Sequence, residues 1–288
     1  MLSSVDRVQL VVRDRAFAVQ RWVDLFGARE TGESSSPLLN ATVSTVRVGV
    51  SEFDFLEPAG PGAAAAFAER WGEGLYGAGF SAPDLAAMAR HLDAQHVDYR
   101  EEGGRLRLGD SATHGMPTLI AEARPPEAIG DIRGLYEVTN PVDDWQKTAD
   151  LYTKIFALDP AKFSPIESTL YGYRGTLTLF DPPARLDRIE ITQTWGDGAM
   201  HRFYQKRGQS LYMCYVETDD VMRLASRLKA RGLRYAHSEE RAADAGLFIH
   251  PSALFGMLMG VSRTNFAWTW SGRPELAGPG AAGIHQEH

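Results

Sequence analysis

An internal duplication constrains this chain of 288 residues more than any other feature of its sequence. A shift of 130 residues lays the segment that starts at Arg7 over the segment that starts at Glu137, with matching apolar positions, an aspartate and a closing phenylalanine. A second shift, of 136 residues, lays the segment around Asp84 over the segment around Asp220. Two segment types therefore recur in the order A, B, A, B, and such a repeat predicts a fold assembled from repeated units.

Each segment predicts the same short unit of secondary structure. It opens with an apolar run such as VQLVV or MCYVE, continues with an aspartate and about twelve residues of helical periodicity, and ends in about three β-like runs. Four aspartates stand where a helix N-cap is expected, namely Asp14, Asp84, Asp144 and Asp220. Gly27 and Gly232 stand where two of the helices should end. The predicted unit is βαβββ, repeated four times.

With the units aligned, the chain resembles the vicinal oxygen chelate superfamily of glyoxalases, bleomycin-resistance proteins and extradiol dioxygenases. The resemblance spans about residues 5–263 and is carried by VDRVQLVVRD with RWVDLFG, GLYGAGFSAPDL, FLEP, LDRIEIT and FIHP. It implies an α+β fold in which the four βαβββ modules pair into two curved-sheet cups. In many members, His and Glu side chains hold a divalent metal in a cup, and the four-module arrangement is most similar to extradiol dioxygenases. The chemistry still has to be argued from the site.

Composition and breaks in the pattern define the organisation that we expect. Residues 1–122 form the first module pair, 123–131 a Pro-rich linker, 132–265 the second pair, and 266–288 a poorly packed tail. The formal net charge of −7 gives no reason to bind nucleic acid, and no apolar run is long enough to cross a membrane. The single cysteine, Cys214, and the lack of a signal-peptide pattern favour a cytoplasmic protein, either monomer or homodimer.

In the first cup, the resemblance places Arg7 and Gly77 at the metal-ligand positions of the opening strands. The closing strands offer Asp54 and either Leu119 or Ala121. One carboxylate facing an arginine is not a metal site, because iron and zinc need several convergent lone pairs. We therefore expect an ion pair between Arg7 and Asp54 inside the cup.

In the second cup, the corresponding positions hold Glu137, Met213, Glu190 and Gly260, so the usual His/His/Glu set is missing. Two carboxylates remain. Strand alternation points both of them into the cup and predicts that Tyr136 lies on the opposite face. We expect no metal here, although iron, manganese or zinc bound by an unusual ligand set stays open as an alternative.

Two carboxylates in an apolar cup repel each other, and burial raises the pKa of at least one of them. A neutral carboxylic acid beside an ionised carboxylate can act as a general acid/base couple, so Glu190 and Glu137 are the candidate catalytic residues. The competing interpretation is that each carboxylate pairs with a nearby arginine, drawn from Arg133, Arg174, Arg188 and Arg202.

Five side chains are candidates for binding the ligand, namely Tyr173, Met213, Tyr215, Phe203 and His201. Their aromatic and apolar character predicts a small hydrophobic or aromatic molecule as the partner. The leading hypothesis is therefore an isomerase- or lyase-type enzyme that acts on a small aromatic or enolisable oxo-compound without a cofactor. The alternatives are a metal-free protein that sequesters a small molecule and an extradiol-type dioxygenase with an unusual ligand set.

Overall fold

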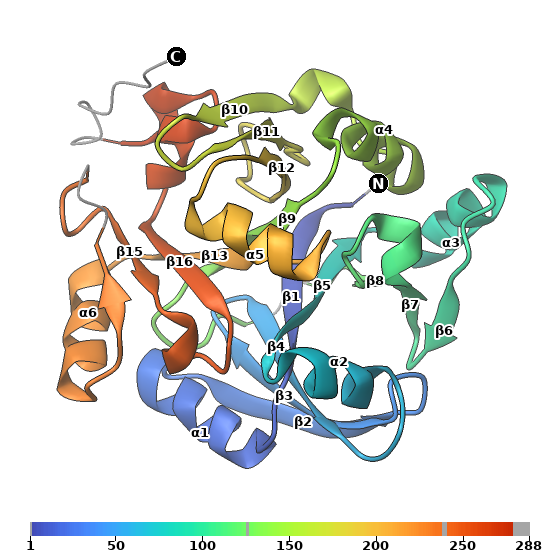
Figure 1. Cartoon of the computed structure of the whole chain (residues 1–288), viewed down its shortest axis with the longest axis horizontal. Helices are drawn as coiled ribbons and strands as arrows, with labels where there is room; N and C mark the ends of the chain where they lie inside the picture. Colours follow the sequence, from blue (N-terminus) through green and yellow to red (C-terminus); the bar gives the residue numbers. More distant parts are fainter. Residues whose placement is uncertain (1, 125–126, 238–240, 279–288) are drawn as a thin grey trace.

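The computed structural model describes residues 2–124, 127–237 and 241–278. They form two curved eight-stranded sheets with helices packed around them (Figure 1). The strand order is β2-β3-β4-β1-β5-β8-β7-β6 in the first sheet and β10-β11-β12-β9-β13-β16-β15-β14 in the second. The two orders are equivalent position by position, which confirms the predicted α+β fold of four βαβββ modules in two cups.

The first sheet and its helices come from the first half of the chain: β1 (Ser4–Val11), α1 (Arg15–Phe26), β2 (Arg29–Ser36), β3 (Ala41–Val48), β4 (Ser51–Pro58), β5 (Gly74–Ala82), α3 (Leu85–Ala94), β6 (Arg100–Glu102), β7 (Arg105–Leu108) and β8 (Thr118–Glu122). The second sheet repeats the pattern: β9 (Gly134–Pro141), α4 (Trp145–Phe156), β10 (Ser164–Ser168), β11 (Tyr173–Leu177), β12 (Arg188–Thr194), β13 (Met213–Thr218), α6 (Val221–Ala230), β14 (Tyr235–Ala236), β15 (Gly246–Ile249) and β16 (Leu258–Arg263). Two further helices, α2 (Ala63–Trp71) and α5 (Ala199–Arg207), connect the modules within each half.

The opening strands join the modules of each half. β1 runs parallel to β4 of its own module and antiparallel to β5 of the next, and β9 pairs in the same way with β12 and β13. The predicted N-caps are also present, since Asp14 accepts a hydrogen bond from Phe17 N at 2.9 Å and Asp84 one from Ala87 N at 2.7 Å. Helix α1 ends at Gly27, whose φ of +66° is the left-handed conformation that glycine adopts easily.

One apolar core crosses both halves and fixes how the two sheets meet. Phe80 of β5 contacts Phe156 of α4 at a ring separation of 5.9 Å and Phe180 at 6.0 Å. Two backbone amides at the start of opposite halves are bound across the junction, Leu135 N by Ser51 Oγ at 2.8 Å and Val5 N by Asp187 Oδ1 at 2.7 Å. The outer face of each sheet thus packs in the apolar core, and the inner faces carry polar and aromatic side chains.

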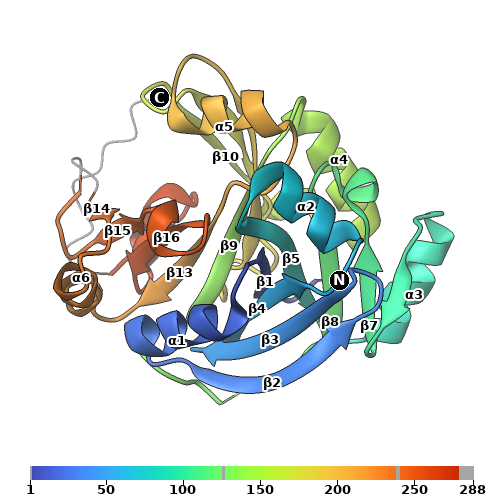
Figure 2. The same cartoon turned by 60° about the horizontal axis from the view of Figure 1, so that its bottom comes forward.

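Helices α2 and α5 lie side by side over the inner faces (Figure 2). On α2, Ala64 and Phe67 pack into the apolar end of the first cup. The guanidinium of Arg207, at the end of α5, lies 5.5 Å from the ring of Phe67 and 5.1 Å from that of Trp71. Within the described ranges, no helix is long and apolar enough to span a membrane.

The chain after β16 packs against the second sheet, which corrects the expectation of a poorly packed tail for the part that the structure describes. Phe266 and Trp268 lie in a short 3-10 helix (Phe266–Trp270) and are buried. Trp268 joins Tyr136 and Leu177 in an apolar cluster on the inner face. Aromatic side chains inside a Gly-rich segment therefore outweigh its turn-like composition. Residues 279–288 lie outside the described residues.

The junction carboxylate Asp187 should make folding stability depend on pH. Burial raises its pKa to about 6, against the opposing effect of Arg185. Because the unfolded chain loses this proton near 3.8, stability should be lost as the pH rises from about 4 to about 6. Asp187→Asn keeps an acceptor for Val5 N and carries no charge. We expect urea unfolding to show the variant on the order of 2–3 kcal/mol more stable than wild type at pH 7, and this gain should largely vanish at pH 4. An equal gain at both pH values would contradict this assignment.

Candidate active site in the second cup

The first cup contains the expected ion pair. Arg7 Nη1 lies 2.8 Å from both carboxylate oxygens of Asp54, and both side chains are buried. Gln9 and Thr45 donate further hydrogen bonds to the same carboxylate, at 3.1 and 2.7 Å. Burial opposes the charged form, but the guanidinium of Arg7 and these hydrogen bonds hold the pKa of Asp54 below its ordinary value. Asp54 is therefore a satisfied carboxylate.

In the second cup, Glu137 forms an ion pair with Arg188 of β12. Parallel pairing of β9 with β12 sets Arg188 directly beside Glu137, and Nε donates to Oε2 at 2.6 Å. The side chain of Arg188 is 0% exposed and that of Glu137 is 1% exposed. The competing interpretation from the sequence thus holds for Glu137, with Arg188 as its partner among the four arginines considered.

Glu190, two residues after Arg188 on the same strand face, forms no ion pair with an arginine among the described residues. Thr139 Oγ1 donates to its Oε2 at 2.7 Å, and Glu137 lies within hydrogen-bonding reach. Burial, followed by the charge of Glu137, raises the pKa of Glu190 well above its ordinary value. Glu137 Oε1 has no other donor in the part of the chain that the structure describes. These facts fit a neutral Glu190 that donates its proton to an ionised Glu137.

A β-bulge places Tyr136 in the cup, which corrects the alternation argued from the sequence. Tyr215 pairs with Glu137 but Val216 pairs with Leu135, so Tyr136 is an extra residue on β9. Its ring lies 4.9 Å from the guanidinium of Arg188, a cation–π contact inside the protein. The first sheet has the same irregularity at Asp6, the position that matches Tyr136 under the 130-residue shift. Neither half of the amino-acid sequence contains a residue pattern that indicates this bulge.

Three of the predicted ligand-binding side chains lie near the carboxylates. Met213 is buried on β13 directly opposite Thr139. Tyr173 lies close enough for burial and the charge of Glu190 to raise the pKa of its hydroxyl. Tyr215 contacts Tyr136 and Trp270 at ring separations of 5.8 and 6.2 Å.

The other two lie at the rim, on α5. His201 Nδ1 is 3.1 Å from Thr194 Oγ1. Phe203 packs edge-on against Tyr212 at 5.0 Å and under Arg207 at 5.1 Å, which directs it toward α2. Sequence reasoning missed Thr139 and Trp270 and did not choose among the arginines. The period-two spacing of Arg188 and Glu190 could have shown that they share a face.

The donor set does not fit the divalent metal that the resemblance implies. Glu137 is engaged by a cation, Met213 offers a thioether, and Gly260 has no donor. The ring of Tyr215 also covers Gly260, where an added Cβ would fall 2.1 Å from the ring. Across residues 2–124, 127–237 and 241–278, no three His, Cys, Asp or Glu side chains gather closely enough to hold a metal ion.

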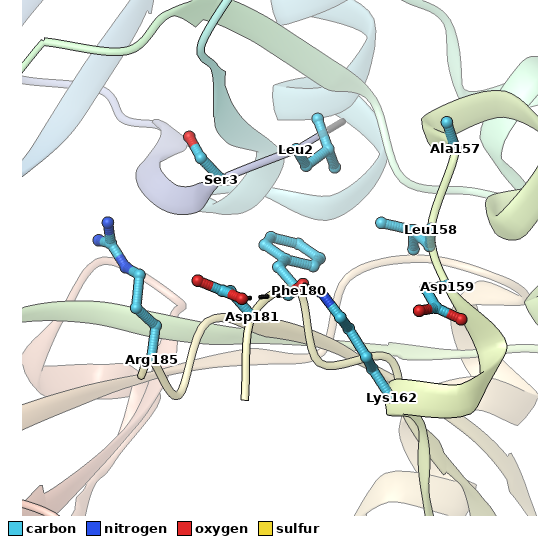
Figure 3. A pocket seen from close by; sticks show the side chains of 9 residues that line it. All are labelled: Leu2, Ser3, Ala157, Leu158, Asp159, Lys162, Phe180, Asp181 and Arg185. Atoms are coloured by element: carbon cyan, nitrogen blue, oxygen red, sulfur yellow. Dashed lines mark hydrogen bonds and ion pairs between the residues drawn. The ribbon is translucent and has the colours of Figure 1, made fainter. Parts of the chain in front are cut away.

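Among the cavities that the described residues form are two that lie outside both cups. One, of about 330 Å³, opens between the first residues of the chain and the loop before β12 (Figure 3), where Lys162 donates to Phe180 O at 3.2 Å and pairs with Asp181 at 3.6 Å. The other, of about 470 Å³, lies at the junction of the halves beside Asp131 and Arg227, which are ion-paired. Neither is lined by Glu137 or Glu190.

Comparisons with known proteins agree with this architecture. Residues 6–111 and 134–259 match two family models, both described as the Glyoxalase/Bleomycin resistance protein/Dioxygenase superfamily. The chain belongs to this superfamily. A sequence comparison with curated proteins gives no match.

Two solved structures share this fold over most of the chain, at low sequence identity. A mutant of 4-hydroxymandelate synthase from Streptomyces coelicolor has a TM-score of 0.72 and 12% identity, over 91% of this chain and 93% of that one. A xylose isomerase-like TIM barrel/4-hydroxyphenylpyruvate dioxygenase fusion protein has a TM-score of 0.60 and 13% identity, over 91% of this chain and 49% of its own. Methylmalonyl-CoA epimerase from Mycobacterium tuberculosis matches 48% of this chain and 92% of its own, with 20% identity and a TM-score of 0.41.

Removing the cation from the second cup should destabilise the fold. Arg188→Met leaves two buried carboxyls without a counter-charge, and we expect a loss of about 3–5 kcal/mol in the free energy of unfolding at pH 7. Urea denaturation measures it. Arg273→Met, which removes an arginine that is 49% exposed, is the control and should cost at most about 1 kcal/mol. Equal losses in the two variants would show that the buried pair contributes nothing special.

Proposed function

We propose that the second cup is an acid/base active site, in which Glu190 exchanges a proton with a small aromatic or enolisable oxo-compound. One observation carries the proposal: within the part of the chain that the structure describes, Glu190 is a buried carboxyl with no cation paired to it, beside Glu137, which is paired with Arg188. Its 7% exposure makes Glu190, and not the fully enclosed Glu137, the carboxyl that a ligand can meet.

The charges divide the roles of the pair. Arg188 fixes the negative charge on Glu137, so the single proton of the carboxyl pair resides on Glu190. Glu190 can give this proton to the oxygen of a carbonyl group as negative charge develops there. The resulting carboxylate can then take a proton from the neighbouring carbon, which restores the acid and leaves a proton shift within the substrate. These two proton transfers together make an isomerase-type reaction. If the substrate instead loses a leaving group after the proton is removed, the reaction is of the lyase type.

The walls of the cup support the proposed class of ligand. Tyr173, Met213 and Tyr215 offer aromatic and apolar contacts beside the carboxyl. Burial raises the pKa of both tyrosine hydroxyls, so they stay protonated and can donate hydrogen bonds to a substrate oxygen. The names of two proteins of similar fold refer to 4-hydroxymandelate and 4-hydroxyphenylpyruvate, which suggests aromatic oxo-acids as the first compounds to try.

A second function, sequestration of a hydrophobic molecule without turnover, is favoured by the closure of the cup. Trp270 from the C-terminal segment packs on Tyr215, and Arg241 lies 4.2 Å from the ring of Trp270. A binding protein needs such an enclosed aromatic site but no proton exchange.

Proton exchange in heavy water separates the two functions. With 4-hydroxyphenylpyruvate as the probe, we expect NMR to show that wild type accelerates exchange of the C–H protons beside the carbonyl. Glu190→Gln should slow this exchange at least about a hundredfold and leave binding intact. Glu167→Gln, which changes an exposed carboxylate on β10, is the control and should match wild type. Binding without accelerated exchange in wild type would favour sequestration, and full exchange in Glu190→Gln would remove Glu190 from catalysis.

The proton on Glu190 should also appear in the pH dependence of folding. Since the folded pKa is raised, the unfolded chain releases this proton first, near the ordinary value of 4.5. Wild type should therefore lose stability relative to Glu190→Gln as the pH rises above about 4.5, by about 1.4 kcal/mol for each unit between the two pKa values. Thermal unfolding of both proteins from pH 4 to pH 9 measures the difference. Parallel curves would mean that Glu190 is ionised in the folded protein.

A further inference from the structure

Helix α5 covers the row of side chains to which Glu190 belongs. Glu190, Thr192 and Thr194 alternate along β12 and therefore share its inner face. Thr192 Oγ1 lies 3.3 Å from the sulfur of Met200, the second residue of α5. Thr194 Oγ1 lies 3.1 Å from Nδ1 of His201, the third. The start of α5 thus rests on the end of the row, and the helix crosses in front of the second sheet in Figure 1.

An aromatic ring cannot reach Glu190 while α5 stays in this place. Glu190 is 7% exposed, and Met213, which faces the same cup from β13, is 4% exposed. Exposure this small admits water at most. A ligand with an aromatic body therefore enters only if an element that covers the cup moves, as the lids of many binding sites do.

Packing fixes α5 less firmly than the other helices of the second half. None of its nine residues is buried, whereas α4 has five buried residues and α6 has four. Its N-cap, Gly198, makes no side-chain hydrogen bond, but Asp144 and Asp220 cap the other two helices. An element with few buried contacts separates from its surroundings at a lower free energy than the core does.

Glycines on both sides of α5 can serve as hinges. Gly196 has a φ of +79° and Gly208 a φ of +71°, in the left-handed region that glycine adopts easily. An added Cβ at either position would have no heavy atom within 4 Å among the described residues. Backbone rotation at these two positions is therefore not blocked by tight packing, and such residues absorb the change in φ and ψ when a segment swings.

Arg207, the last residue of α5, attaches the helix to α2 through aromatic rings. Its guanidinium lies 5.5 Å from the ring of Phe67 and 5.1 Å from that of Trp71, both on α2, and 5.1 Å from Phe203 on its own helix. Among the described residues no carboxylate pairs with it, and burial lowers the pKa of Arg207. Helix α2 is itself fixed, since Ala64 is 0% exposed in the apolar cluster of the first cup.

We infer that α5 is a hinged lid over the second cup and that Arg207 holds it closed against α2. Cation–π contacts of a half-buried arginine are weak enough to break and reform without unfolding of the protein. Because α2 belongs to the first half, entry to the second cup depends on a contact between the two halves. A cup that only sequesters a ligand needs this lid as much as an enzyme does, so the inference goes beyond the proposed function and does not depend on it.

Methionine oxidation measures opening of the lid without any ligand. Met213 lies in the second cup, Met259 is 0% exposed in the outer core, and Met222 is 45% exposed on α6. In dilute hydrogen peroxide, with tandem mass spectrometry to assign the site, we expect Met222 to oxidise fastest and Met259 slowest. Arg207→Gln should speed the oxidation of Met213 at least about fivefold and leave Met222 and Met259 unchanged.

A variant one residue away is the matched control. Lys206→Gln removes the same charge from an exposed position of α5 and should oxidise at Met213 as wild type does. Arg207→Lys keeps the charge without the planar group and should lie between wild type and Arg207→Gln. An unchanged Met213 in Arg207→Gln would overturn the inference, as would an equal acceleration in Lys206→Gln. Equal acceleration of Met213 and Met259 would also overturn it, because the whole protein would then be opening.

Hydrogen exchange followed by mass spectrometry tests the hinges in the same proteins. We expect the amides of α5 in wild type to exchange at least about tenfold faster than those of α4, which has the buried face and the aspartate cap. Arg207→Gln should speed exchange in α5 further and leave α4 unchanged. Equal protection of the two helices in wild type would mean that α5 is a fixed part of the wall, and the inference would fail.

Discussion

The buried ion pair between Glu137 and Arg188 sets the electrostatics of the whole second cup. The parallel register of β9 and β12 makes the pair, and a 0% exposed guanidinium tolerates no arrangement that leaves it unpaired. Because the cation is committed to Glu137, Glu190 is left without one and keeps its proton. The same cation draws the ring of Tyr136 across it, on a residue that the bulge turns into the cup. The acid, its conjugate base and one aromatic wall thus follow from a single contact.

Both cups contain a Glu–Arg pair at equivalent positions, but the arginine and the glutamate have exchanged strands. Arg7 pairs in register with Glu52 across β1 and β4, and Glu137 pairs with Arg188 across the equivalent strands β9 and β12. Two residues further along the closing strand stand Asp54 and Glu190. With the arginine on the opening strand, Arg7 reaches both carboxylates and lowers the pKa of Asp54. With the arginine on the closing strand beside Glu190, the guanidinium reaches across to Glu137, and the pKa of Glu190 rises. The two cups therefore differ in which strand carries the arginine and which the glutamate. In the first cup this arrangement leaves Asp54 ion-paired, and in the second it leaves Glu190 as a carboxyl with a raised pKa.

Much of this could be read from the sequence, because periodicity and caps are local properties. The four aspartate caps and the inward direction of Glu190 follow from spacing alone. The position of Tyr136 does not, since a bulge breaks the alternation on which the argument rests. The choice of Arg188 as partner depended on the register between β9 and β12, a contact across 51 residues. Packing of Trp268 likewise depends on the curvature of a sheet that its own segment does not form.

Closure of the second cup and the protonation of Glu190 depend on each other. Burial is the main reason that its pKa is raised, and Trp270, Tyr215 and α5 help to keep water away. A ligand that brings water with it would stabilise the ionised carboxyl, and the pair would then lose the proton that it holds. A ligand with an apolar ring would keep the carboxyl dry and place its own oxygen as the nearest proton acceptor. The electrostatics of the cup therefore favour an aromatic body with a single reactive carbonyl over a fully polar molecule.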